Sequence, residues 1–198
     1  MKTEPQSDLQ PQESLAIINS MIQTAKNKLA DDGFYIIFWG WLVFAASLIH
    51  YTGIQTGYYQ AGIVWSILMP AGGLVSYLYG RKANKKETVK TYINSYLHYS
   101  WLAFGVALAI TLVFFNVHGL KSTYFFLMLL YGMATFISGG ILNFRPLVIG
   151  GLCSFACAIA SVFLSDQQQL LCIAIALLCS YIIPGHLLRK EYKSQAHV

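Results

Sequence analysis

The side chains best able to do chemistry in this sequence, carboxylates and amines, avoid its long apolar segments. No Asp, Glu, Lys or Arg falls within any of six such segments. Proton pumps, ion-coupled carriers and intramembrane hydrolases place ionisable groups at depth, because those groups perform the reaction. We therefore expect no enzyme activity and no carboxylate-driven transport. The segments are Phe34–Tyr51, Tyr59–Tyr79, Leu97–Phe115, Tyr124–Leu142, Leu147–Leu164 and Leu170–Leu187.

Histidines supply the next candidate chemistry. His50 and His118 fall near one boundary of the segments, and His98 and His186 fall near the other. Facing imidazoles on two helices could ligate haem. However, His98 and His118 would lie ~30 Å apart along one helix, so any sites would sit at the boundaries. Imidazole is also common there because its body is apolar and its tip polar. We expect no cofactor and no metal.

Four cysteines complete the list of reactive side chains. They all fall in the last two apolar segments and form no Cys-x-x-Cys pair. Small buried thiols usually act as apolar packing residues, and that is the role we expect. They are Cys153, Cys157, Cys172 and Cys179.

The apolar segments predict the elements that position these side chains. The 198 residues are 56% hydrophobic and 11% charged, whereas a soluble domain carries about 25% charged residues. Each segment is long enough to cross ~30 Å of hydrocarbon as a helix, and backbone amides cannot stay unpaired in lipid. Aromatic residues near the segment ends, such as Tyr35, Trp39 and Tyr79, are typical of interfacial belts. The predicted fold is all-α: a polytopic six-helix transmembrane bundle over residues 34–187.

The distribution of positive charge predicts the orientation. Of 13 Lys and Arg residues, all but Lys121 fall in 1–33, 80–96, 143–146 and 188–198. Short cytoplasmic loops carry an excess of Lys and Arg. We therefore expect a multi-pass protein of the cell inner membrane with both termini in the cytoplasm and a basic cytoplasmic tail over 188–198. One loop gathers five cations that could bind anionic lipid head groups or a partner: Arg81, Lys82, Lys85, Lys86 and Lys90.

The segment before the first span predicts a second contact element. Residues 1–13 are polar with two prolines, which predicts a disordered cytoplasmic tail. Over 14–30 apolar residues recur at spacings of three and four, which predicts an amphipathic cytoplasmic helix. Its apolar face could cover the end of the bundle, bind a partner or lie on lipid. The candidate docking residues are Ile18, Met21 and Ile22.

Small residues predict how the helices pack. Gly150, Ser154 and Ala158 recur at spacing four, a pattern that allows close helix contact in lipid. We therefore expect the fifth span in the middle of the bundle. Pro70 and Pro184 should each kink their helix, because proline removes a backbone hydrogen bond.

Three stretches, RKANKKETVKTYI, LLYGMATFISGGIL and SYIIPGHLL, resemble those of a group of small bacterial six-span integral membrane proteins of unknown function. The resemblance covers most of the chain. It brings no fold, ligand or catalytic residue with it, so the interpretation depends on the residues themselves.

Two functions remain open from the sequence. The first is a non-enzymatic inner-membrane protein that acts through contacts, as a sensor, scaffold or accessory subunit. Its partners would be the bilayer with its anionic head groups, and a cytoplasmic protein or a second copy of the chain, with no nucleic acid. The alternative is a small-solute binding subunit or permease. Six spans in about 200 residues also resemble the substrate-binding subunits of energy-coupling-factor transporters, although their Ala-x-x-x-Ala pattern is absent from the first span.

Overall fold

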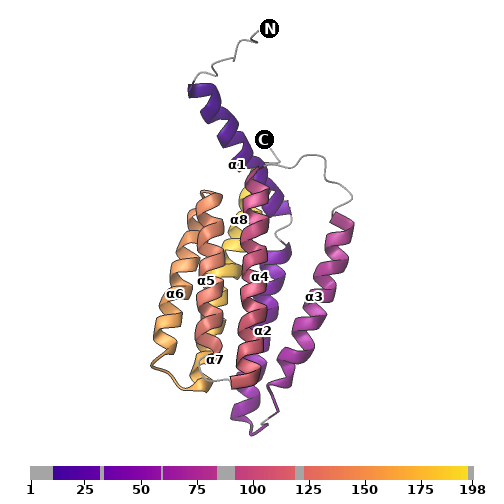
Figure 1. Ribbon diagram of the computed structural model, residues 1–198, viewed down its shortest axis with the longest axis vertical. Helices are drawn as coiled ribbons and strands as arrows, with labels where there is room; N and C mark the ends of the chain where they lie inside the picture. Colours follow the sequence, from indigo (N-terminus) through magenta and orange to yellow (C-terminus); the bar gives the residue numbers. More distant parts are fainter. Residues whose placement is uncertain (1–10, 32–33, 59, 84–91, 119–122, 196–198) are drawn as a thin grey trace, which may run out of the picture.

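Every regular element that the structure describes is a helix. The computed structural model describes residues 11–31, 34–58, 60–83, 92–118 and 123–195. From residue 34 onward its helices run side by side along one long axis (Figure 1). The all-α fold predicted from the sequence is confirmed for these ranges. The helices are α1 (Pro11–Asp31), α2 (Phe34–Gln55), α3 (Ile63–Ala83), α4 (Tyr92–His118), α5 (Thr123–Ile141), α6 (Arg145–Ser161), α7 (Asp166–Leu177), the π-helical turn η2 (Leu178–Ile182) and α8 (Ile183–Gln195).

Five stretches are helical, long and apolar enough to cross a membrane: Phe34–Gln55, Ile63–Arg81, Ser95–Phe114, Thr123–Ile141 and Asp166–Glu191. This finding is compatible with the predicted multi-pass membrane protein.

One further apolar helix, α6, is shorter, with 17 residues, and it corresponds to the predicted fifth span. It ends at Ser161, before the predicted Leu164, because the chain turns over 162–164. The next helix then begins at Asp166, and the Ser165 N–H donates to Oε1 of Gln168 at 3.1 Å. That contact fixes the first turn of α7 four residues before the predicted Leu170.

The last helix is continuous from α7 through η2 to α8, and its irregular turn has a local cause. Pro184 follows η2 and cannot donate a backbone hydrogen bond, and its ring would clash with the carbonyl four residues earlier in a regular α-helix. The N–H of Ile183 instead donates to the Leu178 carbonyl, five residues back. A wide π turn thus accommodates the proline inside a buried helix.

The last helix, over residues 166–195, is the most buried of the five long apolar helices, and it packs against α2. Gly40 allows this contact, because a Cβ on it would lie 2.9 Å from the Cβ of Tyr181. The core gathers buried side chains from α2, α5, α6, α7 and η2. Its members are Ile36, Val43, Leu127, Met128, Tyr131, Ala158, Ile173, Ala176, Leu177 and Tyr181.

The predicted central place of the fifth span is wrong. Its small residues do pack: Gly150 faces the backbone of Cys179 and Ser180, and Ser154 is fully buried. The other face of α6 carries large exposed side chains, including Ile149 and Ile159. Figure 1 accordingly shows α6 at the edge of the bundle, beside α5. A ridge of small residues on one face of a helix indicates one close contact. A central helix would be buried on all of its faces.

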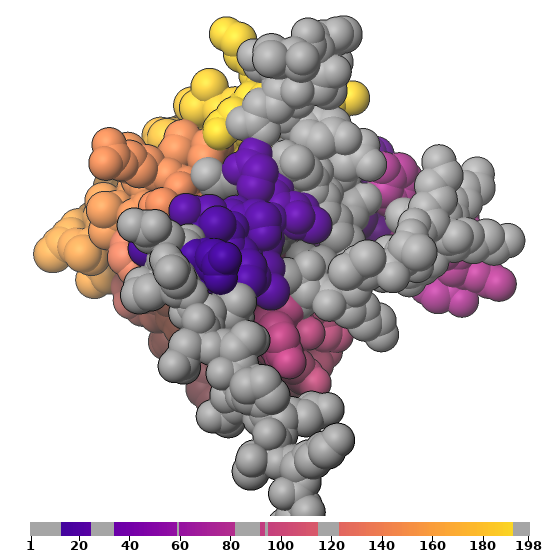
Figure 2. All heavy atoms as spheres, turned by 90° about the horizontal axis from the view of Figure 1, so that it is seen from above, coloured from indigo at the N-terminus to yellow at the C-terminus, as the bar shows by residue number. Residues whose placement is uncertain are grey.

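One end of the bundle collects α1 and the C-terminal part of α8. A second core cluster lies at this end and contains Leu97, Leu142, Phe144, Leu147 and Leu188. The α1 helix contacts α8 and α4, and the view onto this end shows the described part of α1 lying over the bundle (Figure 2).

Candidate functional site

The α1 helix presents apolar side chains that the rest of the chain does not cover. Leu15, Ile17 and Ile18 are 59%, 42% and 51% exposed, whereas Met21 and Ile22 are half-buried. Figure 1 shows α1 extending beyond the end of the bundle. Its first turns therefore carry uncovered apolar side chains, of which Leu15 and Ile18 share one face, and the exposure falls as the helix approaches the bundle.

The structure places the predicted basic cluster apart from α1. Arg81 is exposed near the end of α3, with its guanidinium 5.7 Å from the centre of the Tyr77 ring, a cation–π geometry. Lys82 belongs to α3, while Lys85, Lys86 and Lys90 lie outside the described residues. Because Figure 1 shows the end of α3 at the side of the bundle, Arg81 and the apolar face of α1 do not form one site.

Positive side chains nevertheless gather at a single end of the described bundle. Arg81, Arg145, Arg189 and Lys190 lie at the helix ends on the α1 side, and all four are exposed. At the opposite end the described residues include Asp166 and no Lys or Arg. We call the end with α1 the basic end.

A polar cluster joins three helices near the opposite end. The indole N–H of Trp65 in α3 donates to Nδ1 of His50 in α2 at 3.0 Å, and the hydroxyl of Tyr124 in α5 lies 3.2 Å from the same nitrogen. Because an indole only donates, Nδ1 must accept and carries no proton in this arrangement. His50 is thus a hydrogen-bond anchor between helices. Its nearness to the boundary was predicted, but its partners were not.

A second polar contact attaches α3 to α2 near the basic end. The indole N–H of Trp39 donates to Oγ of Ser76 at 3.0 Å, and the hydroxyl of Tyr35 donates to the Ser76 carbonyl at 3.2 Å. The Tyr79 ring also stacks on Phe34 with centres 4.3 Å apart. Tyr35, Trp39 and Tyr79, interpreted from the sequence as interfacial aromatics, therefore also hold two helices together.

Deep aromatic residues fill the space among α4, α5 and η2. The ring of Tyr181 lies 5.5 Å from that of Tyr131 and 6.2 Å from that of Trp101, both edge-on. The Tyr181 hydroxyl is buried without a hydrogen-bond partner among the described residues. This arrangement packs the core, and no group that could activate a nucleophile is found among these contacts.

The cysteines line the contact between α6 and the last helix. All four are partly buried and free, and the side chains of Cys153 and Cys179 contact one another. Among the described residues no three His, Cys, Asp or Glu side chains lie close enough to hold a metal ion. The contact between Cys153 and Cys179 was not predicted, since these two cysteines are distant in sequence.

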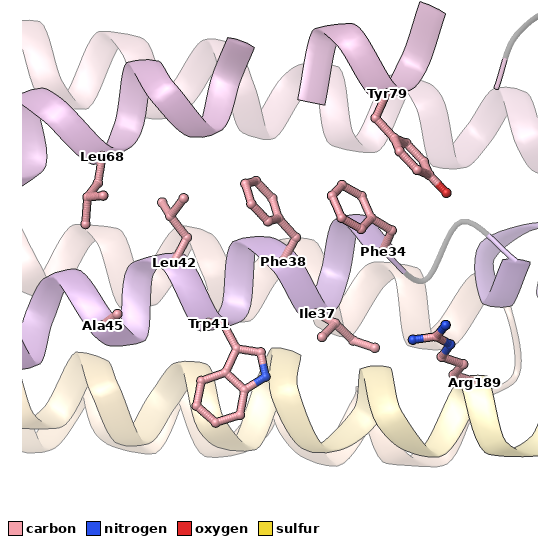
Figure 3. Close-up of a pocket in the computed structure, with 9 residues that line it drawn as sticks. All are labelled: Phe34, Ile37, Phe38, Trp41, Leu42, Ala45, Leu68, Tyr79 and Arg189. Atoms are coloured by element: carbon pink, nitrogen blue, oxygen red, sulfur yellow. The ribbon is translucent and has the colours of Figure 1, made fainter. Parts of the chain in front are cut away.

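A groove follows the face of α2 that points away from the core. Its volume is ≈ 560 Å³, and α3 and α8 form its sides (Figure 3). In Figure 3, Phe34, Phe38 and Leu42 point towards α3, while Trp41 points towards the last helix. The lining residues are Phe34, Ile37, Phe38, Trp41, Leu42, Ala45, Leu68, Tyr79 and Arg189. The groove is therefore apolar along its length and has one cation, at the basic end.

Comparison of the chain with protein-family models, with curated proteins and with solved structures gives no match.

Proposed function

We propose that this chain is a non-enzymatic protein of the cell inner membrane that acts through contacts, with α1 as an amphipathic cytoplasmic docking helix for a protein partner. The observation that carries the proposal is the exposure of Leu15, Ile17 and Ile18 in one helix. Apolar residues on a surface helix are normally covered by the protein's own core. Leaving these three uncovered favours an external contact, as in helix-in-groove recognition.

The bundle is proposed to cross the membrane six times, with both termini in the cytoplasm. The 17 residues of α6 would span ~25 Å, at the lower end of the length that crosses a membrane. Its close packing on α5 supports a shared orientation across the bilayer. The basic end supports a cytoplasmic position for the termini, since short cytoplasmic loops are enriched in Lys and Arg.

Reporter fusions test this topology. A reporter after Ile54 or after Gln168 should be translocated, and a reporter after Asn84 should remain cytoplasmic. A cytoplasmic reporter at Gln168 would mean that α6 and the last helix do not cross as proposed. If α6 did not cross, the five long apolar helices would be the only spans, and the C-terminus would lie outside.

A protein partner fits the exposed face of α1 better than a lipid surface does. Helices that lie on membranes usually carry Lys and Arg on the polar face. The first half of α1 has no Lys or Arg and includes Glu13. The helix also extends past the end of the bundle (Figure 1), which takes its first turns away from the level of the apolar spans.

The alternative of a small-solute binding subunit or permease remains a second proposal with weaker support. A binding site for polar solutes needs a pocket with several convergent polar groups. The groove on α2 is instead lined by apolar side chains, apart from Tyr79 and Arg189. The absence of charged residues from the apolar segments also disfavours ion-coupled transport.

Two matched double variants test docking through α1. Leu15→Asp with Ile18→Asp places two charges on the apolar face, and Ala16→Asp with Ser20→Asp places two on the opposite face. All four positions are exposed, so both variants should fold. A photo-cross-linking side chain at position 14, which lies one turn before Ile18 and away from Ala16 and Ser20, should give one heavier protein adduct when activated in native membranes. The first variant should lose the adduct, because a buried unpaired charge costs several kcal/mol, and the second should keep it.

Three outcomes would contradict the proposal. One is an adduct that contains only lipid, which would assign α1 to the membrane surface. Another is an adduct of two copies of the chain, which would make α1 a self-association element. The third is an equal adduct from both double variants, which would show that the apolar face is not the contact.

A further inference from the structure

We propose that the groove between α2, α3 and α8 is a binding site for one anionic phospholipid, with an acyl chain along α2 and the phosphate at Arg189. This goes beyond the docking function of α1, because it concerns a different surface and a different class of ligand. The site itself does not depend on the proposed orientation. With the proposed orientation, the site lies in the inner leaflet.

The floor of the groove is a continuous apolar stripe of α2. Its residues, Phe34, Ile37, Phe38, Trp41, Leu42 and Ala45, recur at spacings of three and four, so they share one face of the helix. This face points away from the core, and Trp41 is 48% exposed. Leu68 and Tyr79 of α3 form one side of the groove. Such a surface matches a hydrocarbon chain and offers no partner to a polar solute.

The length of the groove matches one leaflet. Phe34 and Ala45 are eleven residues apart, which corresponds to ~16 Å along the helix. That is about half of the ~30 Å hydrocarbon core. A lipid whose head group lies at the basic end would therefore extend its acyl chain to the end of the groove near the midplane. Binding of a second copy of the chain would not require a groove as long as one leaflet is thick.

The charge of the groove selects the head group. Arg189 is exposed, and in Figure 3 its guanidinium reaches towards the end of α2 that begins at Phe34. A guanidinium binds phosphate through two parallel hydrogen bonds, which are stronger than bonds between neutral groups. Arg81, Arg145 and Lys190 add positive charge at the same end of the bundle. An anionic phospholipid therefore fits this end better than a zwitterionic one does.

Lipid retention measured by native mass spectrometry tests the site. The full chain would be placed in nanodiscs of equal parts phosphatidylcholine and phosphatidylglycerol with identical acyl chains, and the lipids that stay bound after release would be identified. The parent should retain one phosphatidylglycerol in preference. Arg189→Gln should lower that preference about tenfold, the effect of losing one charge-assisted contact. Lys190→Gln removes the same charge from the next residue, which does not line the groove, and should keep the preference.

A second pair of variants tests the acyl part of the site. Ala45→Trp should fill the end of the groove and reduce retention of both lipids. Ala71→Trp adds the same side chain at an exposed position of α3 outside the groove and should leave retention unchanged. Equal retention of the two lipids by the parent, or an equal loss in Arg189→Gln and Lys190→Gln, would overturn the proposal. Retention of a second copy of the chain in place of lipid would do so as well. None of these results would affect docking by α1.

Discussion

The two sides of the bundle are held together in different ways. On one side, α5, α6 and the last helix approach through glycine and serine, so backbone meets backbone: Gly139 faces the N–H of Val148, and Gly150 faces the Cys179 carbonyl. On the other side, α3 is attached to α2 by side chains, through Ser76 and His50. Lipid offers helices no hydrophobic drive to associate, so close backbone contact is the more stable solution. The first side should therefore act as a rigid frame, and α3 as an adjustable part.

The largest effect should come from a methyl group added to the rigid side. In Gly139→Ala the new Cβ would lie 2.6 Å from the backbone nitrogen of Val148, and backbone cannot move aside. We expect a loss of about 1–3 kcal/mol in the free energy of unfolding, the range for overpacking, measured by denaturation in detergent. Gly140→Ala is the control, because its Cβ would have no atom within 4 Å. Equal stability of the two variants would remove the proposed difference between the sides.

A smaller loss should follow from breaking one hydrogen bond on the same side. The hydroxyl of Ser154 donates to the Met128 carbonyl of α5 at 2.9 Å. Ser154→Ala should lower the free energy of unfolding by about 0.6 kcal/mol, the mean for such bonds in membranes. Ser138→Ala serves as control, because the hydroxyl of Ser138 donates to Ala134 within its own helix. A larger loss in Ser138→Ala would mean that the bond between helices is not what stabilises this contact.

The same methyl group should matter less on the α3 side. A Cβ on Gly72 would lie 3.0 Å from Cδ1 of Leu42 and 3.3 Å from the Trp39 ring. These are side-chain atoms that can shift, so we expect a loss below about 1 kcal/mol. Gly73→Ala would meet no atom within 4 Å and should be neutral. A loss in Gly72→Ala as large as that in Gly139→Ala would show that α3 is held as rigidly as α6.

Features that depend on neighbouring residues could be predicted from the sequence, whereas contacts between residues distant in sequence could not. The length of the apolar segments and their lack of charge predicted the helices, because a helix forms its backbone hydrogen bonds within one segment. The ridge of Gly150, Ser154 and Ala158 predicted a close contact, but not that α6 lies at the edge, since the exposed side of a membrane helix is as apolar as its buried side. The partners of His50 lie 15 and 74 residues away, and no local pattern specifies such a pair.

For the candidate docking residues, the helix was predicted from the sequence, but the exposure of each side chain was not. The spacing of apolar residues predicted a helix over 14–30, and the structure has α1 over Pro11–Asp31. Spacing alone could not distinguish the exposed Ile18 from the half-buried Met21 and Ile22, because that difference depends on where α8 and α4 contact α1. The groove on α2 was not predicted, since its sides come from helices distant in sequence.

The last effect should be local to one helix, and it tests whether α3 moves independently of the frame. Trp65→Phe removes the N–H that donates to His50 while keeping an aromatic ring, and the Tyr124 hydroxyl still lies beside His50. A loss of about 0.6 kcal/mol corresponds to about a threefold faster opening. Hydrogen–deuterium exchange should therefore accelerate about threefold in α3 and stay unchanged in α5 and α6, with the midpoint of global unfolding preserved. Trp41→Phe is the matched control, because Trp41 is exposed and has no hydrogen-bond partner among the described residues. Faster exchange in α5 and α6 would mean that the two sides unfold as one unit, and the distinction between frame and adjustable helix would fail.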